Sequence, residues 1–420
     1  MKVLLISANT EKLNMPTIPI GLAYVANSTR RAGHDVVLLD LMFEADPLEA
    51  VKKKILEQSP DAIGISVRNI DDQNLQNPEF LLPKVRPIVA TCRSESPAPI
   101  ILGGSGYSLF PDAVLTYLGA DMGIEGDSEI VFPLILERLS SKAPYDDLPG
   151  LHIAGRTGGV APLFTQNLNI CNFPDQEIFS CTDPSRTDVW IPVQTRRGCP
   201  NNCSYCATFR IQGRTIRFCS PQIIVDGLSR LVRAGFRQFY FVDNSFNIPE
   251  SHALALCRSM KRLTTNLRWR AIIYPEFVSE ELVREMAASG CNEVALGFES
   301  GNEIVLRALN KRFSPDKVRR VSDQFAEHGI RRTGFLLLGA PGETRESVEE
   351  SLAFAASLRL DALRVTVGIR LYPHTPLART AVEEGVIRDD DDLLSPRFYL
   401  AAGLEPWIYN RVTPGMYQNS

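Results

Sequence analysis

The sequence of 420 residues lacks several features that would assign the protein directly to a functional class. It contains five histidines, no long run of acidic or basic residues, and a net charge of −4 from 45 basic and 49 acidic residues. Without concentrated positive charge, it offers no electrostatic footprint for nucleic acid. No apolar stretch is long enough to span a membrane, and the N-terminal MKVLLISANT is typical of a first strand, not of a signal peptide. We therefore expect a cytoplasmic protein that binds neither nucleic acid nor a membrane.

The composition is that of a globular protein with more than one core. Hydrophobic residues make up 44% of the chain and charged residues 22%. A chain of 420 residues exceeds one ordinary core, which indicates two domains and a tail. The nine cysteines are odd in number and mostly scattered, so they fit a reducing compartment better than a disulfide framework.

Three of the cysteines, Cys199, Cys203 and Cys206, fall close together in the segment RRGCPNNCSYCATF. Thiolates on one short loop with this spacing can bind three irons of an iron–sulfur cube and leave the fourth iron open. A structural zinc site prefers four protein ligands, and no second CxxC or nearby histidine supplies the remainder; Cys219 is the nearest candidate. The spacing favours a 4Fe–4S cluster, with zinc and three reduced buried thiols as the alternatives.

The first 140 residues alternate apolar runs with amphipathic stretches, as a parallel α/β domain does. The apolar runs predict strands near residues 3–7, 36–40, 62–66, 100–103 and 122–125. The amphipathic stretches predict helices near residues 20–32, 47–58 and 110–118. In an open α/β sheet, a ligand binds over the carboxyl ends of the strands, so the loops after these strands are candidate binding loops.

Two of these loops carry glycine. The segment LGGSG contains Gly103, Gly104 and Ser105, and the segment GIEGDSE contains Glu125 and Gly126 ahead of a predicted helix. Glycine lets backbone approach a ligand closely, and a helix N-terminus can hold polar ligand atoms. Taken alone, each pattern is also typical of a plain turn.

After an irregular linker at residues 141–188, the strand and helix alternation resumes and continues to about residue 385. It predicts an α/β domain over residues 189–385, a partial six-stranded parallel barrel. The expected strands lie near residues 190–195, 238–242, 268–273, 293–297, 333–338 and 364–369, and the expected helices near 221–234, 280–289, 314–327 and 344–357. Residues 386–420 form a C-terminal segment, aromatic enough to fold over the mouth of the barrel.

Polar or glycine-rich loops follow three of the predicted barrel strands, where barrel chemistry belongs. The candidate residues are Asp243, Asn244 and Ser245 in FVDNSFN, Glu299 and Ser300 in GFESG, and Gly339 and Gly342 in GAPGET. The ordinary interpretations are a turn cap, a strand-end ion pair and a plain loop. Three such loops in register beside the cysteine motif favour a binding site.

The segment CPNNCSYC, with Tyr205 before its last cysteine, resembles the signature of the radical S-adenosylmethionine (SAM) enzymes. In that family the open iron binds the amino and carboxylate groups of SAM, and one electron from the cluster cleaves SAM to a 5′-deoxyadenosyl radical. The resemblance implies that the three cysteines bind the cluster. It also implies three sets of contacts with SAM. Asp243, Asn244 and Ser245 would contact the methionyl amino group, although the usual Gly-Gly-Glu is absent. Glu299 and Ser300 would contact the ribose and the carboxylate, and Gly339 and Gly342 would contact the adenine.

The N-terminal segments PIGLAYVANSTRRAGHDVVLLD, LGGSGYSLFPD and GIEGDSE resemble the cobalamin-binding domain of one branch of that family. The resemblance implies a Rossmann-like domain over residues 1–140 that binds cobalamin through Gly103, Gly104, Ser105, Glu125 and Gly126. The loop over residues 8–20 lacks the histidine that coordinates cobalt in the Asp-x-His-x-x-Gly form of the fold. Many members of the branch also lack it, which implies cobalt with water or nothing on its lower face.

Together the two resemblances imply a cobalamin-dependent radical SAM methyltransferase. It would act on an unactivated carbon or phosphorus centre of a small molecule and receive electrons from a donor such as flavodoxin or ferredoxin. One SAM would methylate cobalt, and a second would supply the radical that prepares the substrate for the methyl group. Two alternatives remain: a radical cyclase, rearrangement or oxidation enzyme without methyl transfer, and a non-catalytic cobalamin or redox sensor.

Overall fold

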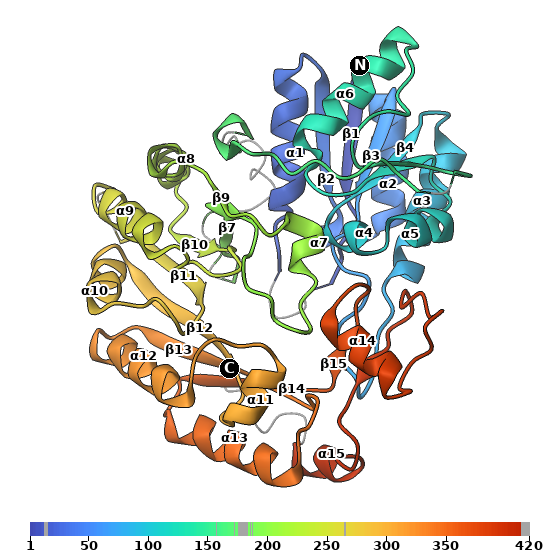
Figure 1. The fold of residues 1–420 in the computed structure, drawn as a ribbon. Helices are drawn as coiled ribbons and strands as arrows, with labels where there is room; N and C mark the ends of the chain where they lie inside the picture. The colour runs from blue at the N-terminus through green and yellow to red at the C-terminus, as the bar shows by residue number, and fades with distance from the viewer. Residues whose placement is uncertain are drawn as a thin grey trace. The chain divides into compact units, whose positions relative to one another are not determined.

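The computed structural model describes residues 1–11, 16–156, 158–171, 173–174, 184, 186, 188–263 and 266–412. Parts of the predicted loop 8–20, linker and C-terminal segment lie outside the described residues. The chain forms two compact units (Figure 1). The N-terminal unit comprises residues 1–72, 79–190 and 208–219, and the C-terminal unit comprises residues 73–78, 191–207 and 220–420. Each unit therefore takes one short segment from the sequence span of the other.

The N-terminal unit is built on a six-stranded sheet with the order β2-β1-β3-β4-β5-β6. Strands β1 to β5 are parallel, and β6 is antiparallel to β5. The strands are β1 (Lys2–Ser7), β2 (Asp35–Asp40), β3 (Ala62–Ser66), β4 (Ile100–Gly103), β5 (Met122–Ile124) and β6 (Leu151–Ile153). The first five lie where the apolar runs predict them, and β6 lies in the segment predicted as an irregular linker.

Helices cover this sheet. They are α1 (Ile20–Arg31), α2 (Pro47–Gln58), α3 (Leu82–Glu95), α4 (Ser105–Leu109), α5 (Pro111–Leu118), α6 (Ser128–Ser141) and α7 (Thr208–Gln212), with 3₁₀ turns at Leu41–Phe43 and Leu168–Cys171. Helix α2 begins where the Asp46 carboxylate accepts the N–H groups of Leu48 and Glu49. The core between sheet and helices includes residues of α1 and α6 such as Leu22 and Phe132. Burial of each such side chain stabilises the fold by about 1.5–3 kcal/mol.

The C-terminal unit contains a second six-stranded sheet, with the order β14-β13-β12-β11-β10-β7 and all pairs parallel. Its strands are β7 (Ile191–Val193), β10 (Gln238–Phe241), β11 (Arg268–Ile273), β12 (Cys291–Glu299), β13 (Arg331–Leu338) and β14 (Ala362–Val367). Because strand order follows chain order, every crossover joins neighbours and all carboxyl ends meet at one edge. This is the predicted open, partial barrel. The two-residue strands β8 (Arg196–Arg197) and β9 (Arg217–Phe218) lie outside both sheets.

Five helices of the C-terminal unit lie along the outer side of the sheet (Figure 1): α8 (Pro221–Arg233), α9 (Glu250–Met260), α10 (Glu280–Ala288), α12 (Pro315–Glu327) and α13 (Arg345–Ser357). The unit also contains α11 (Glu303–Ala308), α14 (Pro376–Glu383) and α15 (Trp407–Arg411). Ser220, Ser279, Ser314 and Thr344 cap four of them by accepting a backbone N–H of the first turn. Within the described residues, none of the helices is long and apolar enough to cross a membrane.

The C-terminal segment is tied to the last barrel strand by a buried arginine. Strand β15 (Ile369–Arg370) pairs antiparallel with β16 (Phe398–Tyr399). The Arg370 guanidinium, 4% exposed, donates to the carbonyls of Leu371, Leu393 and Leu394. Arg370 is therefore a strut that holds the C-terminal segment against the barrel.

Candidate functional site

The three cysteines of the motif lie on the loop that follows β8 in the C-terminal unit. All three are partly buried, and the N–H of Cys206 donates to the Cys203 carbonyl at 3.2 Å. Burial raises the pKa of the Cys199 and Cys203 thiols. Within the described residues, no three His, Cys, Asp or Glu side chains converge on one metal-ion position. A 4Fe–4S cluster does not need three ligands that converge on one position, because each cysteine binds a different iron.

A buried carboxylate and a buried arginine fix the base of this loop. Both oxygens of Asp243, which follows β10, are engaged: Oδ1 accepts the N–H of Thr195 at 2.8 Å and Oδ2 accepts its hydroxyl at 2.6 Å. Arg196 donates through Nε to the Ser245 carbonyl at 2.8 Å and through Nη1 to the Gly198 carbonyl at 3.2 Å. Asp243 and Ser245 thus position the chain leading to the cysteines. Their predicted contact with the methionyl amino group of SAM, shared with Asn244, stays a prediction.

Arg196 also tests whether the loop suits an anionic cluster. Its Nη2 is buried and has no hydrogen-bond partner within the described part of the chain. Burial lowers the pKa of this guanidinium, while Asp243 and Cys199 act in the opposite direction. A buried N–H donor of a guanidinium that lacks a partner costs free energy unless an acceptor or negative charge lies close to it. A cluster held by three thiolates supplies that charge, so these residues fit the group.

Glu299 and Lys311 form a buried triad with Tyr205 of the cysteine motif. Lys311 Nζ lies 3.1 Å from Glu299 Oε1 and 3.0 Å from the Tyr205 hydroxyl, which itself donates to Glu299 Oε1 at 2.9 Å. Burial alone would lower the pKa of Lys311, but Glu299 and Tyr205 raise it well above its usual range. Lys311 is therefore a second buried cation beside the cysteine loop.

A register shift in β12 places Glu299. The pairing of β12 with β13 shifts between Gly297 and Glu299, and Glu299 has φ +64°, a left-handed conformation unusual for this residue. The next residue, Ser300, is fully buried, and its hydroxyl lies 2.8 Å from that of Ser351. Glu299 faces the cysteine loop, whereas the Ser300 hydroxyl is engaged with α13. The predicted ribose and carboxylate contacts stay predictions.

The loop after β13 contains a buried carboxyl group that sequence reasoning did not single out. Glu343 Oε2 accepts the N–H groups of Gly339 and of Ala340, the latter at 3.0 Å. Its Oε1 is buried without a partner among the described residues, and burial raises the pKa of Glu343 to about 7. Gly339 has φ +106°, and an added Cβ would lie 2.6 Å from Leu400. The loop conformation thus requires Gly339; the adenine contact predicted for Gly339 and Gly342 remains untested.

Glu343 predicts a pH-dependent stability difference. Between about pH 4.5 and 7, the carboxyl ionises in the unfolded chain but stays protonated in the folded protein, so the folded state is destabilised as pH rises. Relative to wild type, Glu343→Gln should gain about 3 kcal/mol of unfolding free energy across that interval, because the amide keeps the acceptor and cannot ionise. Chemical denaturation at several pH values measures the difference. A difference independent of pH would contradict the assignment.

In the N-terminal unit, the glycines after β4 let two loops of the protein approach each other. Gly104 has φ +100°, and an added Cβ would lie 2.6 Å from the Val67 carbonyl oxygen. The Ser105 hydroxyl donates to the Arg68 carbonyl at 2.9 Å. Gly103 ends β4 at the same edge. This close approach explains the glycine sequence locally, and the predicted contacts of Gly103, Gly104 and Ser105 with cobalamin stay predictions.

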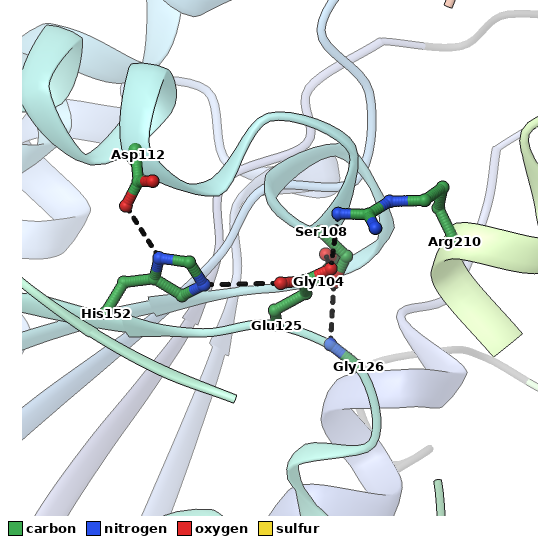
Figure 2. Close-up of polar contacts among 7 residues, drawn as sticks. All are labelled: Gly104, Ser108, Asp112, Glu125, Gly126, His152 and Arg210. Carbon is green, nitrogen blue, oxygen red and sulfur yellow. Dashed lines mark hydrogen bonds and ion pairs between the residues drawn. The ribbon is translucent and has the colours of Figure 1, made fainter. Parts of the chain in front are cut away.

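Glu125 and Gly126, after β5, lie in a hydrogen-bonded network (Figure 2). His152 Nδ1 lies 2.6 Å from Asp112 Oδ1, and its Nε2 lies 3.3 Å from Glu125 Oε2. Arg210 donates to the other oxygen of Glu125 at 2.8 Å, and Gly126 N–H donates to a serine of α4. Burial lowers the pKa of His152, but the two carboxylates outweigh it and raise the value overall. The Glu125 carboxylate is thus engaged within the protein.

A second arginine of residues 208–219 makes a fully buried ion pair at the same edge. Arg217 Nη1 lies 2.7 Å from Asp127 Oδ2, and both side chains are at most 4% exposed. Thr165 N–H donates to the same carboxylate at 2.8 Å. Arg210 and Arg217 therefore anchor residues 208–219, which begin two positions after Cys206, to the loop after β5 of the N-terminal unit.

Residues after β1 and β3, including Asn9 and Asn69, line a cavity of about 20 Å³, the size of one water molecule, at the carboxyl edge of the sheet. Their amide groups are of the kind that can exchange hydrogen bonds with the amide side chains of a corrin.

Several of these residues escaped the sequence analysis for a physical reason. Lys311 lies in the turn after α11, which brings it into contact with Glu299. Neither the spacing of the two residues nor the periodicity of the sequence predicts that contact. Arg217 and His152 act through partners far away in sequence. Arg196 could have been found from the sequence. It is a charged residue just before the cysteine loop, and a charged side chain in a buried strand needs a partner.

Comparison with known proteins identifies both units. Residues 193–355 match the radical SAM superfamily, and residues 6–136 match the B12-binding domain. An uncharacterized methyltransferase of Pyrococcus horikoshii is 24% identical over 92% of this chain and 84% of that protein. The cytidylyl-2-hydroxyethylphosphonate methyltransferase of Streptomyces wedmorensis is 27% identical over 84% of this chain and 76% of its own.

Solved structures agree in fold. The radical SAM methyltransferase TsrM from Kitasatospora setae, with tryptophan and a SAM analogue bound, has a TM-score of 0.87 at 22% identity and covers 98% of this chain and 87% of its own. The cobalamin-dependent radical SAM enzyme OxsB has a TM-score of 0.77 at 16% identity, over 95% of this chain and 64% of its own.

Fold and site together define an α/β enzyme with a three-cysteine barrel domain and a Rossmann-like partner domain. The chain belongs to the radical SAM family, in its branch with a B12-binding domain. Both resemblances noted in the sequence are thereby confirmed. The radical SAM domain implies a 4Fe–4S cluster and SAM, and the B12-binding domain implies cobalamin, as predicted.

Proposed function

We propose that this protein is a methyltransferase that adds a methyl group to an unactivated carbon or phosphorus centre of a small molecule. The observation that carries the proposal is the presence of a radical SAM domain and a B12-binding domain in one chain. When bound, the cluster and SAM supply one-electron cleavage chemistry, and cobalamin carries a methyl group. The phosphonate methyltransferase among the relatives supports the choice of reaction.

The cysteine loop and its two cations hold the cluster. Cys199, Cys203 and Cys206 bind three irons, and Arg196 and Lys311 balance the negative charge from opposite sides of the loop. Two buried cations near the thiolates also stabilise the deprotonated form that binds iron. Because Arg196 is fixed by two carbonyls, it holds its position without a carboxylate pair.

Glu299 and Lys311 orient SAM. A lysine ammonium has three donors; Glu299 and Tyr205 use two, which leaves one N–H for the carboxylate of SAM. Glu299 Oε2 is left for the ribose hydroxyl groups, since its Oε1 takes both contacts inside the triad. The loop held by Glu343 presents backbone to the adenine.

Anaerobic reconstitution of the full chain with iron, sulfide and hydroxocobalamin tests the proposal. With SAM and a reductant, we expect S-adenosylhomocysteine that requires added cobalamin, and 5′-deoxyadenosine when a substrate is present. Tryptophan and cytidylyl-2-hydroxyethylphosphonate are the first probes, because relatives act on them by name. Iron binding without cobalamin binding would overturn the methyl-transfer proposal and leave a simpler radical enzyme.

A second candidate is a radical cyclase, supported by an anaerobic magnesium-protoporphyrin IX monomethyl ester cyclase of Rubrivivax gelatinosus that is 23% identical over 80% of this chain. The same assay separates the two. Cyclisation gives 5′-deoxyadenosine without S-adenosylhomocysteine, whereas methyl transfer gives both.

A further inference from the structure

The barrel sheet of the C-terminal unit has one face that is covered by helices. Helices α8, α9, α10, α12 and α13 lie along this outer side (Figure 1). Outward side chains of three neighbouring strands are buried there: Trp269, Phe298 and Leu336. Side chains alternate between the two faces of a sheet along each strand. The residues of β10 to β14 that alternate with the buried ones therefore form the opposite, inner face.

Side chains do not fill the space over the inner face. In a closed barrel, bulky side chains of the strands pack the interior. Here Phe335, an apolar residue in the middle of β13, is 36% exposed. Its register partner on β12 is Gly297, where an added Cβ would have a single atom within 4 Å, Glu299 Oε1 at 3.3 Å. The ring and the glycine thus border open space, as the walls of a ligand site do.

The inner face carries more positive than negative charge. Its charged residues are Glu293, Glu299, Arg268, Arg270, Arg331 and Arg364. Lys311 offsets Glu299, 3.1 Å away. Asp361 offsets Arg331, 4.0 Å away. Three arginines and one glutamate make up the rest of the charge on this face, which therefore favours an anionic ligand.

Arg364 is the arginine that lies beside the exposed ring. It is the register partner of Phe335 on β14, and it is exposed. Arg270 lies further across the sheet, with its Cζ 4.7 Å from the centroid of the Tyr240 ring, and it pairs in register with Glu293. Phe335 and Arg364 therefore present an aromatic face and a cation side by side.

This pair lies close to the residues proposed to contact SAM. Phe335 precedes Leu338, the last residue of β13, by three positions, which corresponds to about 10 Å along the strand. Gly339 follows directly, and Gly297 precedes Glu299 by two positions. A ligand over the Phe335 ring thus adjoins the proposed SAM contacts and lies deeper in the barrel than they do.

We propose that Phe335 and Arg364 bind the methyl acceptor, and that this acceptor has a planar aromatic ring and an anionic arm, either a carboxylate or a phosphate group. The inference rests on the proposed function and names its substrate class. The ring stacks on Phe335 and lies over Gly297, where no side chain obstructs it. The arm accepts hydrogen bonds from the Arg364 guanidinium, whose planar donors match the oxygens of both anionic groups.

Binding of small probes to the full-length, cofactor-loaded protein tests the substrate class. The anionic probes are indole-3-acetate and cytidine 5′-monophosphate, and their uncharged counterparts are indole-3-acetamide and cytidine. By isothermal titration calorimetry, we expect at least one anionic probe to bind about tenfold more tightly than its counterpart, because a charged hydrogen bond is lost in the latter. Preference for the first probe identifies a carboxylate arm, and preference for the second a phosphate arm. Failure of both anionic probes to bind, or equal binding of charged and uncharged probes, would overturn the proposal.

Arg364→Gln tests the cation. The variant should raise the dissociation constant of the anionic probe about tenfold and leave that of the uncharged probe unchanged, because only the charged contact is lost. The matched control is Arg284→Gln, which neutralises an exposed arginine of α10 on the outer side of the sheet. That control should keep both dissociation constants within about twofold of wild type, as surface substitutions usually do.

Phe335→Leu tests the ring, because leucine stays apolar and cannot stack. It should weaken the anionic and the uncharged probe alike, each by about fivefold. Phe335→Tyr keeps the ring and should restore binding. Equal probe binding by wild type, Arg364→Gln and Phe335→Leu would show that the acceptor does not lie on this face.

The affinity for SAM separates this inference from a defect in the cofactor site. Arg364→Gln and Phe335→Leu should bind SAM as wild type does, because neither residue is among the proposed SAM contacts. A loss of SAM affinity as large as the loss of probe affinity would assign the face to SAM and overturn the inference. A wild-type protein that binds the probes here but yields no S-adenosylhomocysteine would refute the methyltransferase proposal alone.

Discussion

Replacing Cys199, Cys203 and Cys206 together by alanine is expected to remove all iron, about four atoms per chain in the reconstituted wild type, and to abolish SAM cleavage. The three thiolates are the protein ligands that we propose for the cluster, and no three described His, Cys, Asp or Glu groups gather around one metal position elsewhere. Cobalamin content should stay near wild type, because its domain is a separate compact unit. Iron and cobalt analysis with visible spectra measures both.

Cys219→Ala is the matched control. Cys219 belongs to the N-terminal unit and is buried. A zinc site that recruited it as a fourth ligand would lose metal in this variant, whereas a three-cysteine cluster would keep its iron. Zinc in place of iron in the wild type, or loss of iron in Cys219→Ala, would contradict the cluster assignment.

The sequence was sufficient for the parallel strands of both sheets. Apart from the antiparallel β6, the strands of both sheets are parallel and largely buried, and such strands appear as continuous apolar runs whose positions can be located directly. The cysteine motif gives an equally local signal, because its residues are close in sequence, and their binding to the cluster stays a prediction.

The chain's exchange of short segments between units was not predictable in the same way. Residues 208–219 join the N-terminal unit through Arg210 with Glu125 and Arg217 with Asp127, pairs separated by 85 and 90 positions. Ion pairs between residues far apart in the chain produce no periodic pattern in the sequence from which they could be predicted. The loop GIEGDSE was interpreted as a ligand loop from its sequence; two of its three carboxylates, Glu125 and Asp127, bind arginines of the same unit, and its contact with cobalamin stays a prediction.

These contacts suggest why the site is built as it is. The segment after the last cysteine ends in ion pairs at the carboxyl edge of the B12-binding domain, and the segment before the first cysteine is fixed by Asp243. Within the C-terminal unit, the chain before the cluster loop is thus held by hydrogen bonds to a buried carboxylate. Within the N-terminal unit, the buried pair of Arg217 with Asp127 contributes little to net stability but demands one geometry.

Lys311→Met is expected to destabilise the protein by about 3–5 kcal/mol, because it leaves the carboxylate of Glu299 buried without its cation. The side chains of Lys311 and Glu299 are 4% and 13% exposed, so water cannot compensate for the loss. Chemical denaturation of the cluster-free protein under reducing conditions gives the free energy of unfolding. Lys317→Met removes a more exposed pair with Glu276, whose side chains are 21% and 25% exposed, and should cost less than about 1 kcal/mol.

A double-mutant cycle decides whether the ion pair causes the effect. Combining Lys311→Met with Glu299→Gln removes both charges, and the double variant should be more stable than the sum of the single losses predicts by about 1–3 kcal/mol. Additive losses would show that Lys311 acts through packing of its methylene chain. Equal costs for Lys311→Met and Lys317→Met would show that the triad is not desolvated, and the assignment of Lys311 as a buried counter-charge to the cysteine loop would then fail.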